Sequence, residues 1–132
     1  MNLRYVSIDE VYFIHKAIFA RAGSKGGVRD FGLLHSAVER PKATFFGKDL
    51  YPTLFDKAAA LLQSLTLNHP FTDGNKRVSW ITTKRFLKLN GCQLRVERDD
   101  AVEFMISVGN EKLELTKIAE WLKQHSEREL ER

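Results

Sequence analysis

The stretch NHPFTDGNKR, from Asn68 to Arg77, gathers a histidine, an aspartate, an asparagine, a lysine and an arginine in one short segment. His69 is the side chain among them that can accept a proton near pH 7, so it is the candidate general base. Asp73 offers carboxylate oxygens, which suit a magnesium ion that also contacts phosphate. These residue types predict a site that handles phosphate groups.

The residues after Asp73 should begin a helix, because Asn75 opens a run of residues with helical spacing. Gly74 would let a ligand approach the backbone closely, and Asn75 would either cap the helix or donate from its amide to an oxyanion. Lys76 and Arg77 fall in the first turn, where the helix dipole disfavours cations. A bound anion is the simplest compensation, so we expect Gly74, Asn75, Lys76 and Arg77 to bind phosphate.

The rest of the chain predicts the helices that must position this segment. Apolar spacing and capping residues predict helices over 7–22, 30–39, 53–68, 75–89, 99–108 and, from near Thr116, to 124. We expect an irregular connection over 41–52, a short extended piece near 92–97 and a solvated, charged helical extension or fraying tail from about 125 to 132. The prediction is an all-α fold in one domain, residues 1–132, with about six helices and the motif in the loop between the third and the fourth.

Composition limits the cellular setting and the partners. The chain has 132 residues, 43% of them hydrophobic, and a formal net charge of +4, which permits a phosphate-bearing partner. Cys92 is the only cysteine, so no internal disulfide is possible. The N-terminal residues carry charges and no long apolar run, so we expect a cytoplasmic protein without a membrane partner. The basic stretch Arg21 to Arg29 lacks interleaved aromatic residues, so a nucleic-acid partner is not expected.

Three other histidines lie outside the motif. His15 falls on the apolar face of the first helix, where we favour a packing role over a catalytic one. His35 and His125 are expected on the surface. No second histidine stands at H-x-x-x-H spacing from His69, so a metal hydrolase is a weaker alternative.

The motif also carries a family resemblance. His69 to Arg77 resembles the signature of the Fic/Doc superfamily, H-x-F-x-(D/E)-(A/G)-N-(K/G)-R, with Phe71 at the place of the buried loop anchor. The segments GGVRDFGLLHSAVERP and LYPTLFDKAAALLQSL before it, and FLKLNG after it, resemble those of death-on-curing (Doc) toxins. The resemblance covers about Gly23 to Gly91 and implies a Fic/Doc-type helical bundle.

The resemblance further implies that part of ATP is moved onto a protein hydroxyl with Mg²⁺ present. By it, His69 would be the base, Asp73 the metal ligand, and Asn75, Lys76 and Arg77 the phosphate grip. Adenylylating Fic enzymes usually read G-N-G-R-x-x-R. This chain has Lys76 in place of the glycine after the asparagine and Trp80 in place of the second arginine. Both departures resemble Doc, which implies transfer of the γ-phosphoryl of ATP to a threonine or serine of a translation elongation factor.

Two alternatives stay open at this point. The chain could instead transfer AMP as a protein adenylyltransferase, or it could be a non-catalytic basic binding module on the Fic scaffold. Some Fic proteins inhibit themselves through a helix bearing [ST]-x-x-x-E-[GN]; the nearest segment here, Thr116 to Glu120, is followed by Trp121. We therefore expect restraint by a separate Phd-like antitoxin, which the resemblance to Doc implies.

Overall fold

Helices dominate the computed structural model, which describes residues 2–22 and 27–129. Six α-helices lie within the described residues, and their ends fall close to the expected ones: α1 Ile8–Ala22, α2 Phe31–Glu39, α3 Leu54–Leu67, α4 Asn75–Leu89, α5 Arg98–Asn110 and α6 Leu115–Gln124. The expected helical fold is confirmed. Among these helices, none combines the length and apolar character needed to cross a membrane.

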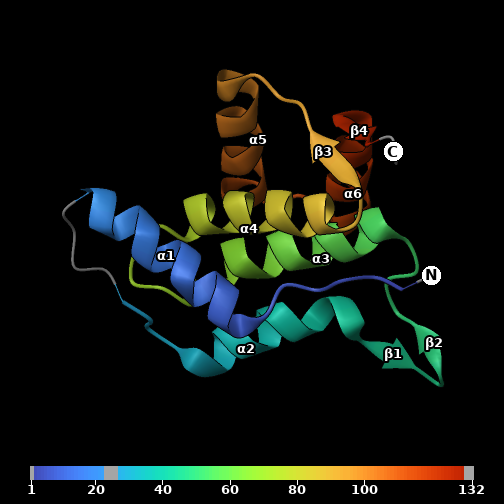
Figure 1. Ribbon diagram of the computed structural model, residues 1–132, viewed down its shortest axis with the longest axis horizontal. Helices are drawn as coiled ribbons and strands as arrows, with labels where there is room; N and C mark the ends of the chain where they lie inside the picture. Colours follow the sequence, from blue (N-terminus) through green and yellow to red (C-terminus); the bar gives the residue numbers. More distant parts are fainter. Residues whose placement is uncertain (1, 23–26, 130–132) are drawn as a thin grey trace.

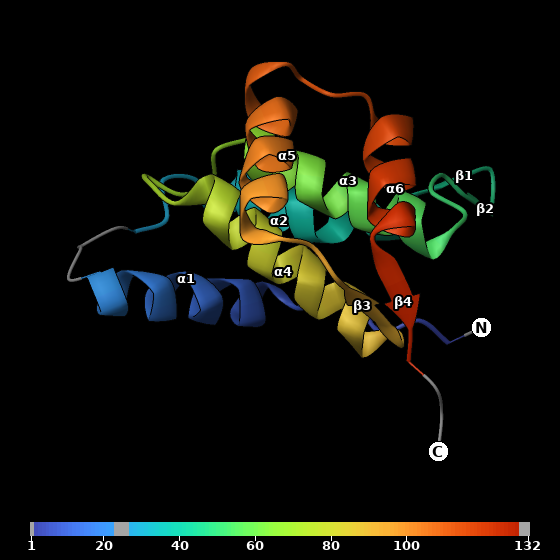
Figure 2. The same cartoon turned by 90° about the horizontal axis from the view of Figure 1, so that it is seen from above.

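The centre of the molecule is the antiparallel pair α3 and α4 (Figure 1). α1 and α2 lie along one side of this pair, and α5 and α6 stand on the other side (Figure 1). In the view from above, α5 and α6 lie in front and α1 runs along one edge (Figure 2). The loop between α3 and α4 lies at the end of the molecule where α1 ends. The element order therefore brings the C-terminal ends of α1 and α5 to the start of α4.

The expected amphipathic helix α3 is the most deeply buried of the six. Ala58, Leu61 and Leu65 have almost no exposed surface, and an intact capping box at Thr53 and Asp56 begins the helix. Apolar residues from all six helices join α3 in one core cluster. Because α3 is buried on most sides, its C-terminal end is held in place. The start of the following loop is therefore held as well.

Buried hydroxyl groups fix α4 against α3. Thr66 Oγ1 and Ser79 Oγ lie 2.8 Å apart, and both are within 2.8 Å of the Leu62 carbonyl oxygen. A buried polar network that is satisfied in this way specifies one arrangement of its helices. The network sets how far apart the two ends of the loop lie.

Two small antiparallel sheets accompany the helices. In the expected irregular connection, Arg40–Lys42 forms a 3₁₀ turn (η1), and Thr44–Phe45 (β1) pairs with Lys48–Asp49 (β2). The turn of this hairpin contains Phe46 and Gly47, both with positive φ. The hairpin is therefore a correction to the irregular connection that we expected over 41–52.

The expected charged tail is also corrected. Cys92–Leu94, where an extended piece was expected, forms β3 and pairs with β4, Ser126–Arg128. β4 is neither a helical extension nor a free tail, although Glu127 and Arg128 are exposed. Alternating charged residues also suit an exposed strand, and α6 delivers this segment beside β3. Residues 130–132 of the expected tail lie outside the described part.

Candidate active site

The candidate site is built on the loop of residues 68–74, which joins α3 to α4. His69 and Gly74 have left-handed backbone conformations, with φ of +48° and +78°. Gly74 is the N-cap of α4, and the first intrahelical bond runs from Val78 N to Gly74 O. The N–H groups of the helix residues before Val78 therefore have no acceptor within α4 and remain available to an anion.

Asn75 closes the loop with its side chain. Its Oδ1 accepts a hydrogen bond from Phe71 N at 3.0 Å, and its Nδ2 donates to Phe71 O at 2.9 Å. Asn75 is thus the first residue of the helix, and Gly74 holds the cap position that we had considered for it. Both ends of its carboxamide are occupied by the loop. The group of Asn75 that remains available to an anion is its backbone N–H.

Phe71 has the buried position expected of a loop anchor. Its side chain is 1% exposed and its ring stacks on the imidazole of His15 at 4.0 Å with an interplanar angle of 9°. Phe19 packs against the same imidazole, with its ring centroid 4.4 Å from that of His15. Two side chains of α1, His15 and Phe19, therefore support the buried side of the loop.

A cleft of about 890 Å³ opens over the loop and the first turns of α4. The motif contributes His69, Thr72, Asp73, Gly74, Asn75, Lys76 and Arg77 to its lining, and the opposite wall includes Leu94, Val96, Arg98, Val102, Met105 and Ile106. The structure therefore brings every predicted site residue except the buried anchor Phe71 into one cleft. The wall from β3 and α5 had no motif that sequence reasoning could have used.

The two cations at the start of α4 differ in what they contact. Lys76 reaches across to α5, where its Nζ lies 3.4 Å from Asn110 Oδ1, and a Cβ atom at Gly109 would lie 2.6 Å from its Cε. The C-terminal end of a helix is the negative end of its dipole, so α5 stabilises this ammonium group. Within the described residues, Arg77 makes no hydrogen bond or ion pair. Its guanidinium is exposed and can reach a ligand in the cleft, whose lining also includes Lys84 and Arg98.

Asp73 is exposed at the edge of the cleft. Its Oδ1 accepts the N–H of Gly74 at 2.7 Å, and no group of three or more metal-ligating side chains occurs in the described part of the chain. A single carboxylate that shares the ion with substrate phosphates is the donor set on which protein-bound magnesium often relies. The chemistry of the loop therefore fits Mg²⁺ held together with a nucleotide.

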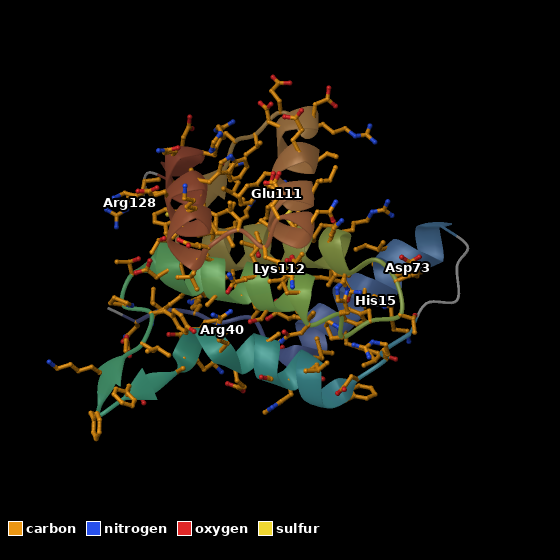
Figure 3. The ribbon with its side chains drawn as sticks, turned by 180° about the vertical axis from the view of Figure 1, so that it is seen from behind. His15, Arg40, Asp73, Glu111, Lys112 and Arg128 are labelled. Atoms are coloured by element: carbon orange, nitrogen blue, oxygen red, sulfur yellow. The ribbon has the colours of Figure 1, made fainter. Side chains whose placement is uncertain are left out.

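His15 lies beneath the loop, close to Asp73 (Figure 3). It is 1% exposed, and its Nε2 has no hydrogen-bond partner among the described residues. Burial lowers the pKa of His15 below its ordinary value, and the backbone and carboxylate of Asp73 act in the opposite direction. The imidazole is neutral at pH 7 and serves as an aromatic support, which agrees with the favoured packing role.

The remaining histidines lie away from the loop. His35 is exposed on α2, as expected. His125 is half-buried, because its ring stacks on Trp121 at 4.0 Å and its Nδ1 lies 2.7 Å from the Trp121 carbonyl oxygen. The surface position expected for His125 is therefore wrong.

A segment that the sequence did not connect with the motif runs beside it. Val28 forms an antiparallel bridge with Phe71, and the backbone of Gly27 exchanges hydrogen bonds with Thr72. The N–H groups of Arg29 and Asp30 both donate to Pro70 O, at 2.8 and 3.0 Å. Gly27 to Asp30 thus forms a cradle for the loop, and Arg29 belongs to it.

A family model described as the Fic/DOC family matches residues 5–87. The chain belongs to the Fic/Doc family. The match ends within α4, so it contains the loop, its cradle and the support from α1, but neither β3 nor α5. The Fic/Doc motif therefore forms one side of the cleft, and residues beyond the matched segment form the other.

Two Fic/Doc relatives resemble the chain over most of its length. A protein named Toxin Doc from Mycolicibacterium smegmatis (strain ATCC 700084 / mc(2)155) is 50% identical over 99 residues, which cover 74% of this chain and 76% of that protein. A protein named Protein kinase doc from Escherichia phage P1 is 24% identical over 122 residues, which cover 92% of this chain and 95% of that protein.

We predict that Gly74→Ala destabilises the protein more than Gly91→Ala. Both glycines have φ near +80°, so an alanine should cost about 1 kcal/mol of unfolding free energy at either position. At Gly74 the new Cβ would also lie 2.9 Å from Phe19 Cε2, whereas nothing lies within 4 Å at Gly91. The clash should add about 1–3 kcal/mol, measured by urea unfolding.

The Phe19→Leu background provides the control for this comparison. Removing the aromatic ring should reduce the extra cost of Gly74→Ala and leave the cost of Gly91→Ala unchanged. Equal losses for the two alanine variants in the parent protein would contradict the proposed close contact.

We also predict a pH dependence that comes from His15. Because its pKa is lower in the folded than in the unfolded chain, its neutral form is favoured by folding, and the associated stability is present above about pH 6.5 and lost as pH falls. The slope from this one group is at most about 1.4 kcal/mol per pH unit. Urea unfolding at pH 8 and pH 5.5 should show a smaller difference for His15→Phe than for the parent protein.

His35→Gln is the matched control, since His35 is exposed on α2. It should retain the full pH dependence of the parent. An unchanged slope in His15→Phe would show that His15 does not titrate differently on folding.

Proposed function

We propose that this chain is a Doc-like toxin that transfers the γ-phosphoryl group of ATP to a threonine or serine of a bacterial protein. The observation that carries the proposal is the shared cleft, in which the candidate base His69 faces the same space as Arg77 and the open N-terminus of α4. Phosphoryl transfer asks a protein mainly to position the nucleophile and to stabilise charge on phosphate. The cleft offers both functions without a covalent intermediate.

In the proposed reaction the target hydroxyl gives its proton to His69 as its oxygen forms a bond to the γ-phosphorus. The bond from that phosphorus to the β–γ bridging oxygen breaks, and ADP leaves with the electron pair. Charge on the transferred phosphate oxygens is stabilised by the N–H groups at the start of α4 and by the Arg77 guanidinium. Bound magnesium would supply further charge neutralisation, and Asp73 is the residue that would hold it.

Residues of α4 favour phosphoryl over AMP transfer. Trp80, one turn beyond Arg77, places an indole in the cleft where the adenylylating motif has a second arginine. Lys76 fills the place of a glycine and turns toward Asn110, so its side chain narrows the space beside the helix end. An anion site at the helix end with the Arg77 guanidinium beside it suits a terminal phosphate, which carries more charge than a phosphate esterified to ribose.

The family relationship supports a toxin role for this chemistry. The names Toxin Doc and Protein kinase doc describe two relatives, and we extend both descriptions to this chain. We further propose a translation elongation factor as the target and a Phd-like antitoxin as the inhibitor. No glutamate lines the cleft within the described part of the chain, which favours inhibition by a separate protein.

We predict that the purified protein, given a bacterial lysate and magnesium, transfers label from γ-labelled but not from α-labelled ATP. Intact-mass and peptide analysis should show a gain of one phosphate on a threonine or serine. His69→Ala should abolish the transfer, because it removes the proton acceptor, and His35→Ala should retain it. Label from α-labelled ATP with a gain of AMP would replace the kinase proposal with adenylylation. Transfer by a folded His69→Ala variant would exclude His69 as the base.

We predict that Asp73→Asn weakens the response to magnesium while it preserves the loop. An asparagine oxygen can still accept the N–H of Gly74, but it lacks the charge of a carboxylate. Transfer at low magnesium should fall by about two orders of magnitude, with partial recovery at high magnesium. Asp99→Asn, on the exposed first turn of α5, is the matched control. Undiminished transfer by Asp73→Asn, or by the parent protein in excess chelator, would remove the metal role.

A further inference from the structure

The candidate base occupies an unfavourable backbone conformation. His69 has a φ of +48° and is followed by Pro70. A residue with a Cβ atom is strained in the left-handed region, and a following proline restricts its backbone further. Such a conformation persists only where the surrounding structure imposes it, so the contacts of the neighbouring carbonyl groups are informative.

Arg29 makes those contacts with its side chain. Its Nε donates to His69 O at 2.8 Å, and its Nη2 donates to Asn68 O at 3.1 Å. The guanidinium therefore spans two successive carbonyl groups, one in the peptide bond that precedes His69 and one in the peptide bond that follows it. A rigid fork of charged donors suits this arrangement, because hydrogen bonds from ionised groups are stronger than neutral ones.

The backbone that carries this guanidinium is itself fixed. The N–H groups of Arg29 and Asp30 donate to Pro70 O, and Val28 bridges Phe71. Asp30 also caps α2, because its Oδ1 accepts the N–H of Leu33 at 3.0 Å. The arginine is thus held between a helix start and the loop, and its fork reaches the carbonyls from an anchored position.

We infer that Arg29 is a positioning residue, which holds His69 in its left-handed conformation and so keeps the imidazole in the cleft. Without the fork, the strain at His69 would no longer be offset, and the peptide bonds around it would relax toward extended conformations. The imidazole would then leave its place opposite the anion site. The inference rests on the proposed role of His69 as the base, but the hold on the backbone can be measured without any transfer.

Kinetics provide the first test. Arg29→Ala should lower kcat by about tenfold to a hundredfold, the range expected when a catalytic group is misplaced by about 1 Å. KM for ATP should stay unchanged, since the phosphate-binding groups lie on α4. Arg29→Lys should behave like Arg29→Ala, because an ammonium group keeps the charge but cannot span two carbonyls. Arg95→Ala, which removes an exposed guanidinium paired with Glu127, is the control and should retain kcat.

Chemical rescue separates positioning from general stability. Arg29 is exposed, so ethylguanidinium at millimolar concentration has access to the space that Arg29→Ala vacates. It should raise the kcat of Arg29→Ala several-fold and leave that of His69→Ala unchanged. A loss of activity that matches the unfolded fraction of Arg29→Ala, with no response to ethylguanidinium, would overturn the inference.

A measurement of the His69 backbone separates this inference from the proposed function. The Cα and carbonyl chemical shifts of His69, measured by NMR, should change in Arg29→Ala and Arg29→Lys and stay the same in Arg95→Ala. If the parent protein transfers nothing, these shifts still decide whether Arg29 holds His69. If AMP moves instead of phosphate, the same kcat comparison applies. Unchanged His69 shifts in both Arg29 variants would refute the inference.

Discussion

Two hydrogen bonds between the Asn75 carboxamide and the Phe71 backbone close the loop on which the site depends. They join the first residue of α4 to the middle of the loop, so the open helix end and the loop form one rigid unit. The hydroxyl contact between Thr66 and Ser79 fixes the same helix to α3. The distance between His69, which follows the end of α3, and the N–H groups at the start of α4 is therefore fixed.

The sequence was sufficient to predict the helices and the location of the loop. Apolar spacing and caps are local signals: Asp30 caps α2 as its position predicts, and α3 begins after Thr53, close to its expected start. The role of Asn75 could not be read in this way. A carboxamide can cap a helix, bind an oxyanion or clamp a backbone, and only the conformation of the loop decides among these.

Other features depended on contacts between distant segments. Arg29 and His69 are 40 positions apart, and nothing in a basic stretch indicates that one arginine will bind two carbonyl groups. β3 and β4 pair only because α6 brings Ser126–Arg128 back beside Cys92–Leu94. Very short strands carry too few residues for their alternation to be distinguished from that of a helix or a tail.

The two cations in the first turn of α4 have different surroundings. Two cations in the first turn of a helix predicted a bound anion, yet the end of α5 already stabilises Lys76. Gly109 makes that contact possible, because any side chain there would occupy the path of the lysine stem. A position on α5, outside the segment matched to the family, is thus tied to a residue of the motif. In evolution the two should change together: a larger residue at Gly109 would be tolerated where the lysine of the motif is replaced by a glycine.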